Sequence, residues 1–116
     1  MIKNIKKFEE KSLDAGEGVS MAMLISDEIA PNFMMRKFRI KSGGYMPYHT
    51  NSVEHEQFVL NGKAKVVIDG KEQIVKEGDI LFIPSGIAHS YEVIGDEDYE
   101  FLCLVPNRED EVELVG

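Results

Sequence analysis

Short apolar segments alternate with turn dipeptides through the middle of this chain, and that alternation limits the folds open to it. Turn signals occur at Asn61-Gly62, Asp69-Gly70 and Glu77-Gly78. Asparagine-glycine and aspartate-glycine pairs favour the tight turns that join antiparallel strands, because these residues tolerate a positive φ. We therefore predict a hairpin with a type I′ turn at Asn61-Gly62 and a second tight turn at Asp69-Gly70.

The segments between such breaks have the length and composition of strands, and none shows a convincing long helical period. A further turn is predicted at residues 42–44, where the sequence reads S-G-G. The predicted strands are residues 19–26, 33–40, 56–60, 63–68, 71–75, 79–83, 89–94 and 100–105. So many short strands separated by close turns predict an all-β sandwich or barrel.

The two ends of the chain fit this pattern less well. Residues 1–17 form an N-terminal arm in which Ile2, Ile5 and Phe8 suit either a helical stripe or an edge strand. Residues 107–116 form an acidic C-terminal tail that we expect to be solvated. At 116 residues, the whole chain is expected to form a single domain.

Composition excludes several classes of partner. The net charge is −8, from 13 basic and 21 acidic side chains, which argues against a nucleic-acid backbone as partner. No apolar run approaches membrane-spanning length, and the charged start of the chain lacks the apolar core of a secretory signal. The single cysteine, Cys103, fits a reducing compartment. We therefore expect a cytoplasmic protein that binds neither nucleic acid nor membrane.

The segment 33–40 alternates in polarity. One face carries Met34, Arg36, Phe38 and Ile40, and we place it inward because it is the more apolar of the two. Arg36 then either lies inside the protein, where its charge needs a partner, or extends outward from the strand end. The sequence does not choose between these two positions.

Two predicted strands are apolar on both faces, namely L-F-I at residues 81–83 and F-L-C-L-V at residues 101–105. A strand in a small barrel needs only one buried face. The second apolar face therefore suggests contact with another sheet or another subunit, and we predict a homodimer.

All three histidines lie in two glycine-bounded segments. His49 and His55 lie between Gly43 and Gly62, and His89 follows Gly78. Side chains two residues apart share one face of a strand, so the residue at position 51 points the same way as His49. A neutral imidazole offers a lone pair to a metal, and histidine is the commonest protein ligand. This arrangement favours one metal site over three unrelated polar residues on turns.

The spacing of these segments resembles the two motifs of the cupin family. The first motif is glycine, five residues, His-x-His, three or four residues, glutamate, six residues, glycine; its positions here are Gly43, His49, Asn51, His55 and Gly62. The second is glycine, five residues, Pro-x-Gly, two residues, histidine, three residues, asparagine; its positions here are Gly78, Pro84, Gly86, His89 and Val93. The resemblance implies a double-stranded β-helix (jelly-roll) barrel, usually dimeric, with a divalent metal inside.

The chain departs from the family pattern at three positions. Asn51 replaces the second histidine of the first motif, His55 stands at the glutamate position, and Val93 replaces the final asparagine. A subgroup of small bacterial and archaeal cupins reads His-x-His-x-x-Glu-His-Glu and has an all-histidine site. The stretch H-T-N-S-V-E-H-E resembles that subgroup except at Asn51. The spacing to Gly62 selects His55 as the ligand rather than Glu56, which faces the other side of the strand.

The resemblance implies that His49, His55 and His89 bind the metal, with Asn51 as a fourth candidate. Three outcomes are open at Asn51: weak coordination by its side-chain oxygen, a water held in its place, or a weakened site without metal. The cofactor would be a divalent transition metal (Mn, Fe, Ni, Cu or Zn).

The expected pocket residues are Met34, Arg36, Phe38, Gln57, Phe101 and Cys103. Arg36 would orient an anionic group. Cys103 is either close to the metal or a small buried hydrophobe, and we favour the second role. We expect a metal-dependent enzyme with oxygenase-type chemistry on a small, partly apolar organic molecule. The alternatives are isomerase or lyase chemistry, and a small-molecule-binding module without turnover.

Overall fold

The strand β3 (Phe33–Asn51) joins the two halves of this fold. The computed structural model describes residues 1–115. The other elements are η1 (Ile5–Lys7), β1 (Lys11–Ser12), β2 (Glu17–Ile25), β4 (His55–Asn61), β5 (Lys63–Ile68), β6 (Lys71–Lys76), β7 (Ile80–Ile83), β8 (His89–Ile94), β9 (Tyr99–Pro106) and β10 (Val112–Leu114). Each predicted strand overlaps one of these strands.

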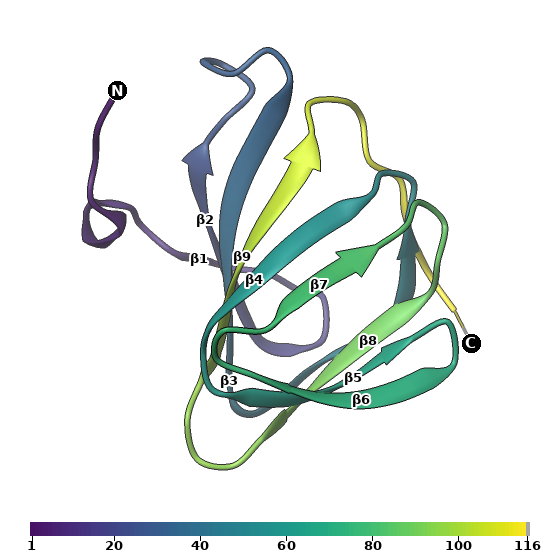
Figure 1. Ribbon diagram of the computed structural model, residues 1–116. Coiled ribbons are helices and arrows are strands. Elements are labelled where there is room, and N and C mark those ends of the chain that lie inside the picture. The colour runs from purple at the N-terminus through teal and green to yellow at the C-terminus, as the bar shows by residue number, and fades with distance from the viewer. Residues whose placement is uncertain (116) are drawn as a thin grey trace.

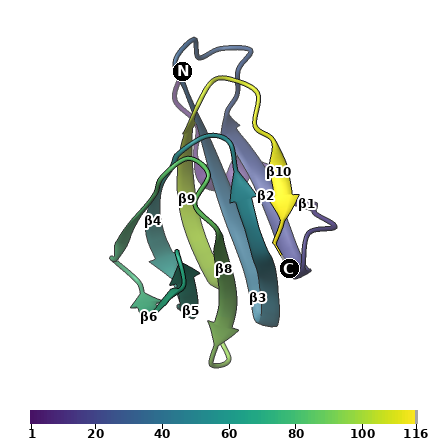
Figure 2. The same ribbon diagram turned by 90° about the vertical axis from the view of Figure 1, so that its right-hand side faces the viewer.

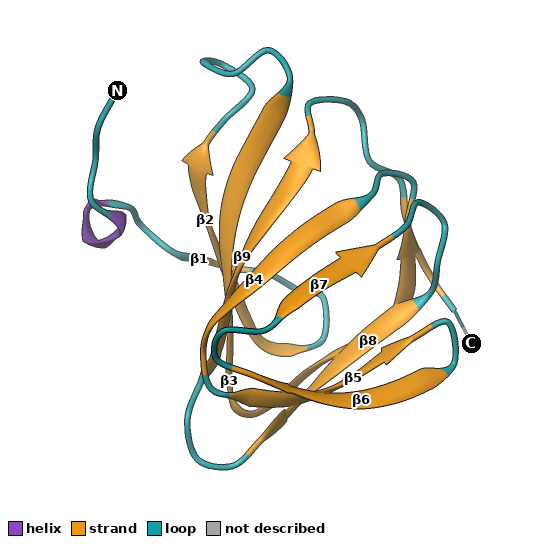
Figure 3. Cartoon of the chain, in the orientation of Figure 1, coloured by secondary structure: helices purple, strands orange, loops and turns teal. Residues whose placement is uncertain are grey.

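The strands form one continuous sheet whose two halves meet at β3 and curl toward each other (Figure 1, Figure 3). The first part of β3 pairs with β2 and β9, and β4 and β7 continue that half. The second part of β3 pairs with β8 and β10, and β5 and β6 continue the other half. All these pairs are antiparallel, so the predicted all-β barrel is confirmed.

The turn predicted at residues 42–44 is wrong, because β3 continues through them as a strand. The pairing of β2 with β3 is instead interrupted between Ile40 and Tyr45. Gly43 has a φ of 83° in this interval, which glycine adopts at little steric cost. The irregularity bends the strand rather than reversing it, and β3 can therefore pass from one half of the sheet into the other.

No hairpin forms at Asn61-Gly62, so that prediction is also wrong. β4 pairs with β7 and β9, whereas β5 pairs with β6 and β8. Gly62 has a φ of 80°, but Asn61 is not among the residues with positive φ, which excludes a type I′ turn. Glycine is needed here because a β-carbon would collide with the carbonyl oxygen of Asp98. Both residues of Asp69-Gly70 have positive φ, 53° and 76°, and that turn does join a hairpin, β5 with β6.

The face of β3 that was predicted to point inward does line the interior of the barrel. Phe38 and Ile40 are buried, and Met34 packs against the core. Phe38 also stacks on Phe101 of β9, with ring centroids 5.3 Å apart. The aromatic side chains of these two paired strands therefore form one wall of the interior.

Each end of the chain contributes one short strand, β1 and β10. The residues of η1 are exposed and no stripe is buried, while β1 pairs with β2. The tail is largely exposed, as expected, but it folds back so that β10 pairs with β3 from His49 to Asn51, as Figure 2 shows. Its last residue, Gly116, lies outside the described residues. Across residues 1–115 the structure contains no helix with the length and apolar character needed to cross a membrane.

Candidate metal and ligand site

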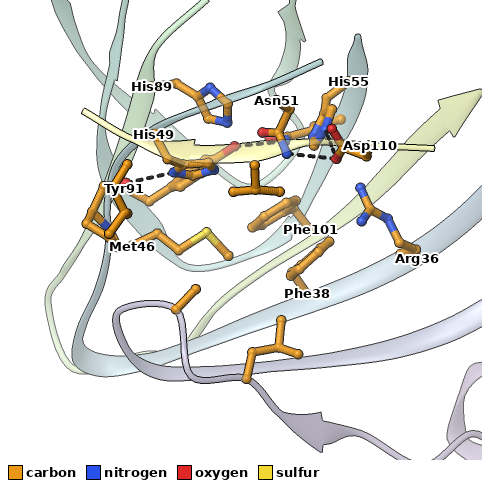
Figure 4. A pocket seen from close by; sticks show the side chains of 16 residues that line it. Arg36, Phe38, Met46, His49, Asn51, His55, His89, Tyr91, Phe101 and Asp110 are labelled. Carbon is orange, nitrogen blue, oxygen red and sulfur yellow. Dashed lines mark hydrogen bonds and ion pairs between the residues drawn. The ribbon is translucent and has the colours of Figure 1, made fainter. Parts of the chain in front are cut away.

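A pocket of about 180 Å³ lies inside the barrel, beneath the tail (Figure 4). Eight of the predicted site residues line it: Arg36, Phe38, His49, Asn51, His55, Gln57, His89 and Phe101. Met34 and Cys103, also predicted to line it, do not. Met34 packs against the core, and Cys103 is fully buried behind the wall. The alternation of residues along a strand predicts which side chains face the interior. It does not predict which of these inward-facing side chains line the pocket.

His49 and His89 face each other across the paired strands β3 and β8. Their ring centroids are 4.3 Å apart. Nδ1 of His49 lies 2.7 Å from the carbonyl oxygen of Pro47, and Nδ1 of His89 lies 2.9 Å from that of Ile87. A carbonyl oxygen only accepts hydrogen bonds, so each Nδ1 must carry the proton when the ring is neutral. Each Nε2 then keeps its lone pair for a metal.

His55, at the start of β4, completes the group of imidazoles. Its Nδ1 lies 3.3 Å from Sγ of Cys103. Burial, followed by the positive charge of Arg36, lowers the pKa of His55 to about 3. Burial likewise lowers the pKa of His89 to about 4. Both rings are therefore neutral near pH 7, the form that binds metals.

The side chain of Asn51 lines the pocket and also contacts the C-terminal tail. Its Nδ2 donates a 2.8 Å hydrogen bond to Oδ2 of Asp110, and Asp110 also lines the pocket. The sequence does not predict the position of Asp110, since that position depends on the pairing of β10 with β3 and Asp110 lies 59 residues after Asn51. The only local signal is the alternation of Val112, Glu113 and Leu114 directly after it, which is typical of a strand.

Arg36 points into the barrel, which settles the choice that the sequence left open. Its NH2 group donates to Sγ of Cys103 at 3.3 Å, and its guanidinium lies 5.0 Å from the ring centroid of Phe38. No Asp or Glu among residues 1–115 forms an ion pair with it. A partly buried guanidinium without a carboxylate partner is suited to binding an anionic ligand.

A buried pair of polar side chains lies deeper in the pocket. Gln57 donates a 2.8 Å hydrogen bond from Nε2 to the hydroxyl oxygen of Tyr91. Burial raises the pKa of Tyr91 well above its ordinary value, so this hydroxyl stays protonated. The pair can offer hydrogen bonds to a ligand, but neither group is a ready general base near pH 7.

The polar atoms of the lining fit a metal or a polar ligand. Arg36 Nε, Asn51 Oδ1, His55 Nε2 and Gln57 Oε1 are buried and have no hydrogen-bond partner within residues 1–115. Buried polar groups are normally paired, so such a concentration indicates a site that binds something. In the same part of the chain, no group of three or more His, Cys, Asp or Glu side chains is arranged so that it could hold a metal ion without movement. A metal would therefore draw its ligands together as it binds.

Residues 36–105, which hold both histidine segments, match the family model described as "Cupin domain". The chain belongs to the cupin family. This cupin is 32% identical over 98 residues to the oxalate-binding protein of Thermotoga maritima, and the match covers 81% of each chain. It is 36% identical over 52 residues to quercetin 2,3-dioxygenase of Bacillus subtilis, but that match covers 44% of this chain and only 15% of the dioxygenase.

Solved structures share the fold over nearly the whole chain. The polyketide cyclase RemF of Streptomyces resistomycificus matches with a TM-score of 0.90 and 24% identity, covering 100% of this chain and 87% of RemF. A predicted oxalate decarboxylase of Thermotoga maritima matches with a TM-score of 0.80 and 27% identity, covering 91% of this chain and 98% of that protein. These relatives confirm the predicted cupin barrel, and the family is one of metal-binding or small-molecule-binding barrels.

Proposed function

We propose that this cupin holds a divalent transition metal through His49, His55 and His89 and binds a small organic anion beside it. The observation that carries the proposal is the state of the imidazoles. Backbone carbonyls hold the Nδ1 protons of His49 and His89, and Nε2 of His55 is buried without a partner among residues 1–115. The bound metal would supply Lewis-acid or redox chemistry toward an oxygen atom of the ligand.

The size of the pocket supports a small ligand. Its volume is about 180 Å³, and an apolar cavity of about 150 Å³ is known to hold a molecule the size of benzene. A metal ion would occupy part of this space. A ligand with few non-hydrogen atoms therefore fits better than a polycyclic one.

The chemistry of the walls supports an anion with some apolar surface. Arg36 has no carboxylate partner among residues 1–115, and a guanidinium binds a carboxylate through two parallel hydrogen bonds. Phe38 and Phe101 provide an apolar wall beside it. The relative from Thermotoga maritima is named for oxalate binding, and oxalate, a small dicarboxylate, is therefore the first probe.

Metal binding is tested by elemental analysis of tag-free protein. We expect about one transition metal ion per chain in the wild type and loss of that metal in His49→Ala and His89→Ala. The control is Glu92→Gln, which changes an exposed carboxylate on the same strand as His89 and should keep the metal. A wild type that stays empty after incubation with Mn, Fe, Ni, Cu and Zn salts overturns the proposal.

Anion binding is tested by calorimetry with oxalate on the metal-loaded protein. Arg36→Gln should weaken oxalate binding by roughly 10- to 100-fold, because it removes a charge-assisted hydrogen bond. Arg108→Gln is the matched control, since Arg108 is an exposed guanidinium that does not line the pocket. Equal oxalate affinity in wild type and Arg36→Gln would exclude Arg36 as the anion-binding group.

Oxygenase-type chemistry is the second candidate, and the partial match to quercetin 2,3-dioxygenase favours it. It is tested by oxygen consumption of the metal-loaded protein with oxalate as the probe. Consumption that depends on both the metal and the organic probe would support an enzyme. Tight binding of oxalate without turnover would favour the binding module.

A further inference from the structure

Asp110 is an acidic side chain from the tail that ends inside the histidine pocket. It lines the pocket together with His49, Asn51, His55 and His89 (Figure 4). Its neighbours Glu109 and Glu111 are exposed, whereas Asp110 is partly buried. The tail therefore directs one of its carboxylates toward the imidazoles and leaves the adjacent ones in solvent.

Hydrogen bonds with Ser52 hold the tail at this position. The backbone N–H of Ser52 donates to Oδ1 of Asp110 at 2.9 Å, and that of Glu111 donates to the hydroxyl oxygen of Ser52 at 2.8 Å. A backbone hydrogen bond from Ser52 to the carbonyl oxygen of Glu111 adds to them, at 3.1 Å. Oδ1 of Asp110 is thus occupied, while Oδ2 faces the pocket.

Oδ2 of Asp110 lies close to both Asn51, which replaces the second histidine of the first cupin motif, and the imidazole of His55. It accepts a 2.8 Å hydrogen bond from Nδ2 of Asn51 and lies 3.9 Å from Nε2 of His55. Oxygen and nitrogen ligands bind zinc at roughly 2.0–2.2 Å in a tetrahedral arrangement, which places two donors roughly 3.4 Å apart. Oδ2 and Nε2 would therefore need to approach each other by only about 0.5 Å to share one metal ion.

We propose that Asp110 supplies the carboxylate ligand of the metal, and that Asn51 orients this carboxylate instead of binding the metal itself. The inference rests on the proposed metal site of His49, His55 and His89. Three neutral imidazoles leave both positive charges of a divalent ion uncompensated, and one carboxylate offsets half of that charge. A carboxylate is also a stronger donor than a neutral amide oxygen toward such metals.

The test compares Zn²⁺ affinity, measured by competition with a chelator, in wild type and in variants. Asp110→Asn keeps an acceptor for Ser52 but loses the charge, and we expect it to weaken zinc binding by at least roughly 100-fold. Asn51→Ala should weaken it less, by roughly 10-fold, as is typical for the loss of an outer-shell partner. Asp110→His should restore most of the affinity, because it returns a ligand. Glu113→Gln, an exposed change on β10, should have no effect.

A direct readout separates a ligand from a structural role. The ¹³C resonance of the Asp110 side-chain carboxyl, assigned by its absence in Asp110→Asn, should shift on Zn²⁺ addition to the wild type. If wild type binds zinc but this resonance stays unchanged, or Asn51→Ala loses more affinity than Asp110→Asn, the inference is overturned and the three-histidine site stands. If wild type binds no metal at all, the proposed function fails and the inference fails with it.

Discussion

Asn51 and Asp110, 59 residues apart in the chain, are joined by a 2.8 Å hydrogen bond from Nδ2 to Oδ2. An ionised carboxylate has no proton to donate, so the amide must turn its nitrogen toward Asp110. Its oxygen is then left buried without a partner among residues 1–115. This contact connects the strand that carries His49 to the tail that covers the pocket.

Asn51→Ala should loosen the tail in the metal-free protein. The substitution removes the hydrogen bond to Asp110, which is worth roughly 1 to 2 kcal/mol because one partner is charged. We expect the amide hydrogens of Ser52 and Glu111 to exchange roughly 10-fold faster, as measured by hydrogen exchange with NMR. Glu113→Gln is the control. Unchanged exchange in Asn51→Ala would mean that the backbone pairing alone holds the tail.

Gly62→Ala should destabilise the protein much more than Gly70→Ala. Both glycines have positive φ, 80° and 76°, but only Gly62 lies against another backbone, the carbonyl of Asp98. The conformational cost of roughly 1 kcal/mol is common to both variants. Gly62→Ala adds a steric collision, so we expect a total of roughly 2–4 kcal/mol in urea unfolding. Equal losses in the two variants would show that the chain relaxes around position 62.

Glu10 forms ion pairs with Lys37 and Arg39, and these pairs should contribute a pH-dependent part of the free energy of unfolding. Glu10 accepts hydrogen bonds from Arg39 and Lys37, each with an N–O distance of 2.8 Å. These contacts, that with Arg39 foremost, lower the pKa of Glu10 from 4.5 to about 2. The native state therefore binds fewer protons than the unfolded state between these two values. The stabilisation is present above pH 4.5 and is lost as the pH falls toward 2.

Glu10→Gln should accordingly lower the free energy of unfolding at pH 7 by about 1 kcal/mol, a value reduced for partial solvent screening. The difference from wild type should shrink as the pH is lowered from 4.5 toward 2. Urea unfolding at several pH values measures it. Glu9→Gln, at the exposed neighbouring position, is the control. A Glu10→Gln difference that is the same at pH 7 and pH 3 would contradict the linkage.

Local signals were sufficient to predict most of the strands and the inward face of β3, because alternation and turn residues act within a few positions. They did not predict β1, β10 or the second half of β3. Local signals failed where contacts between distant segments determine which strands pair. Asn61-Gly62 and Asp69-Gly70 carry the same hairpin signal, yet only the second joins paired strands. At Gly62 the approach of Asp98 requires a glycine, and this contact is invisible in the local sequence.

In the site, too, local motifs predicted some residues, whereas a residue placed by a long-range contact was missed. Motif spacing placed His49, Asn51, His55 and His89 in one region, and all four line the pocket. Their roles as metal ligands remain predictions. Asp110 was missed because the acidic composition of the tail predicts solvation, whereas the pairing of β10 with β3 and the contacts with Ser52 bring it inside. Composition describes the average preference of a segment: Glu109, Glu111 and Glu113 are exposed as it predicts, whereas Asp110 is partly buried.

The outer face of β4 and β7 should hold two copies of this chain together. Phe58 pairs directly with Ile80, and Phe82 follows on the same face; their exposed fractions are 42%, 79% and 58%. Because a contiguous exposed apolar face of this kind marks an interface, we expect a dimer in analytical ultracentrifugation. Phe82→Glu should weaken it by at least roughly 30-fold, the effect of losing a central contact. Ile74→Glu, at a similarly exposed position on β6, should leave the dimer intact. A monomeric wild type at millimolar concentration would exclude this interface.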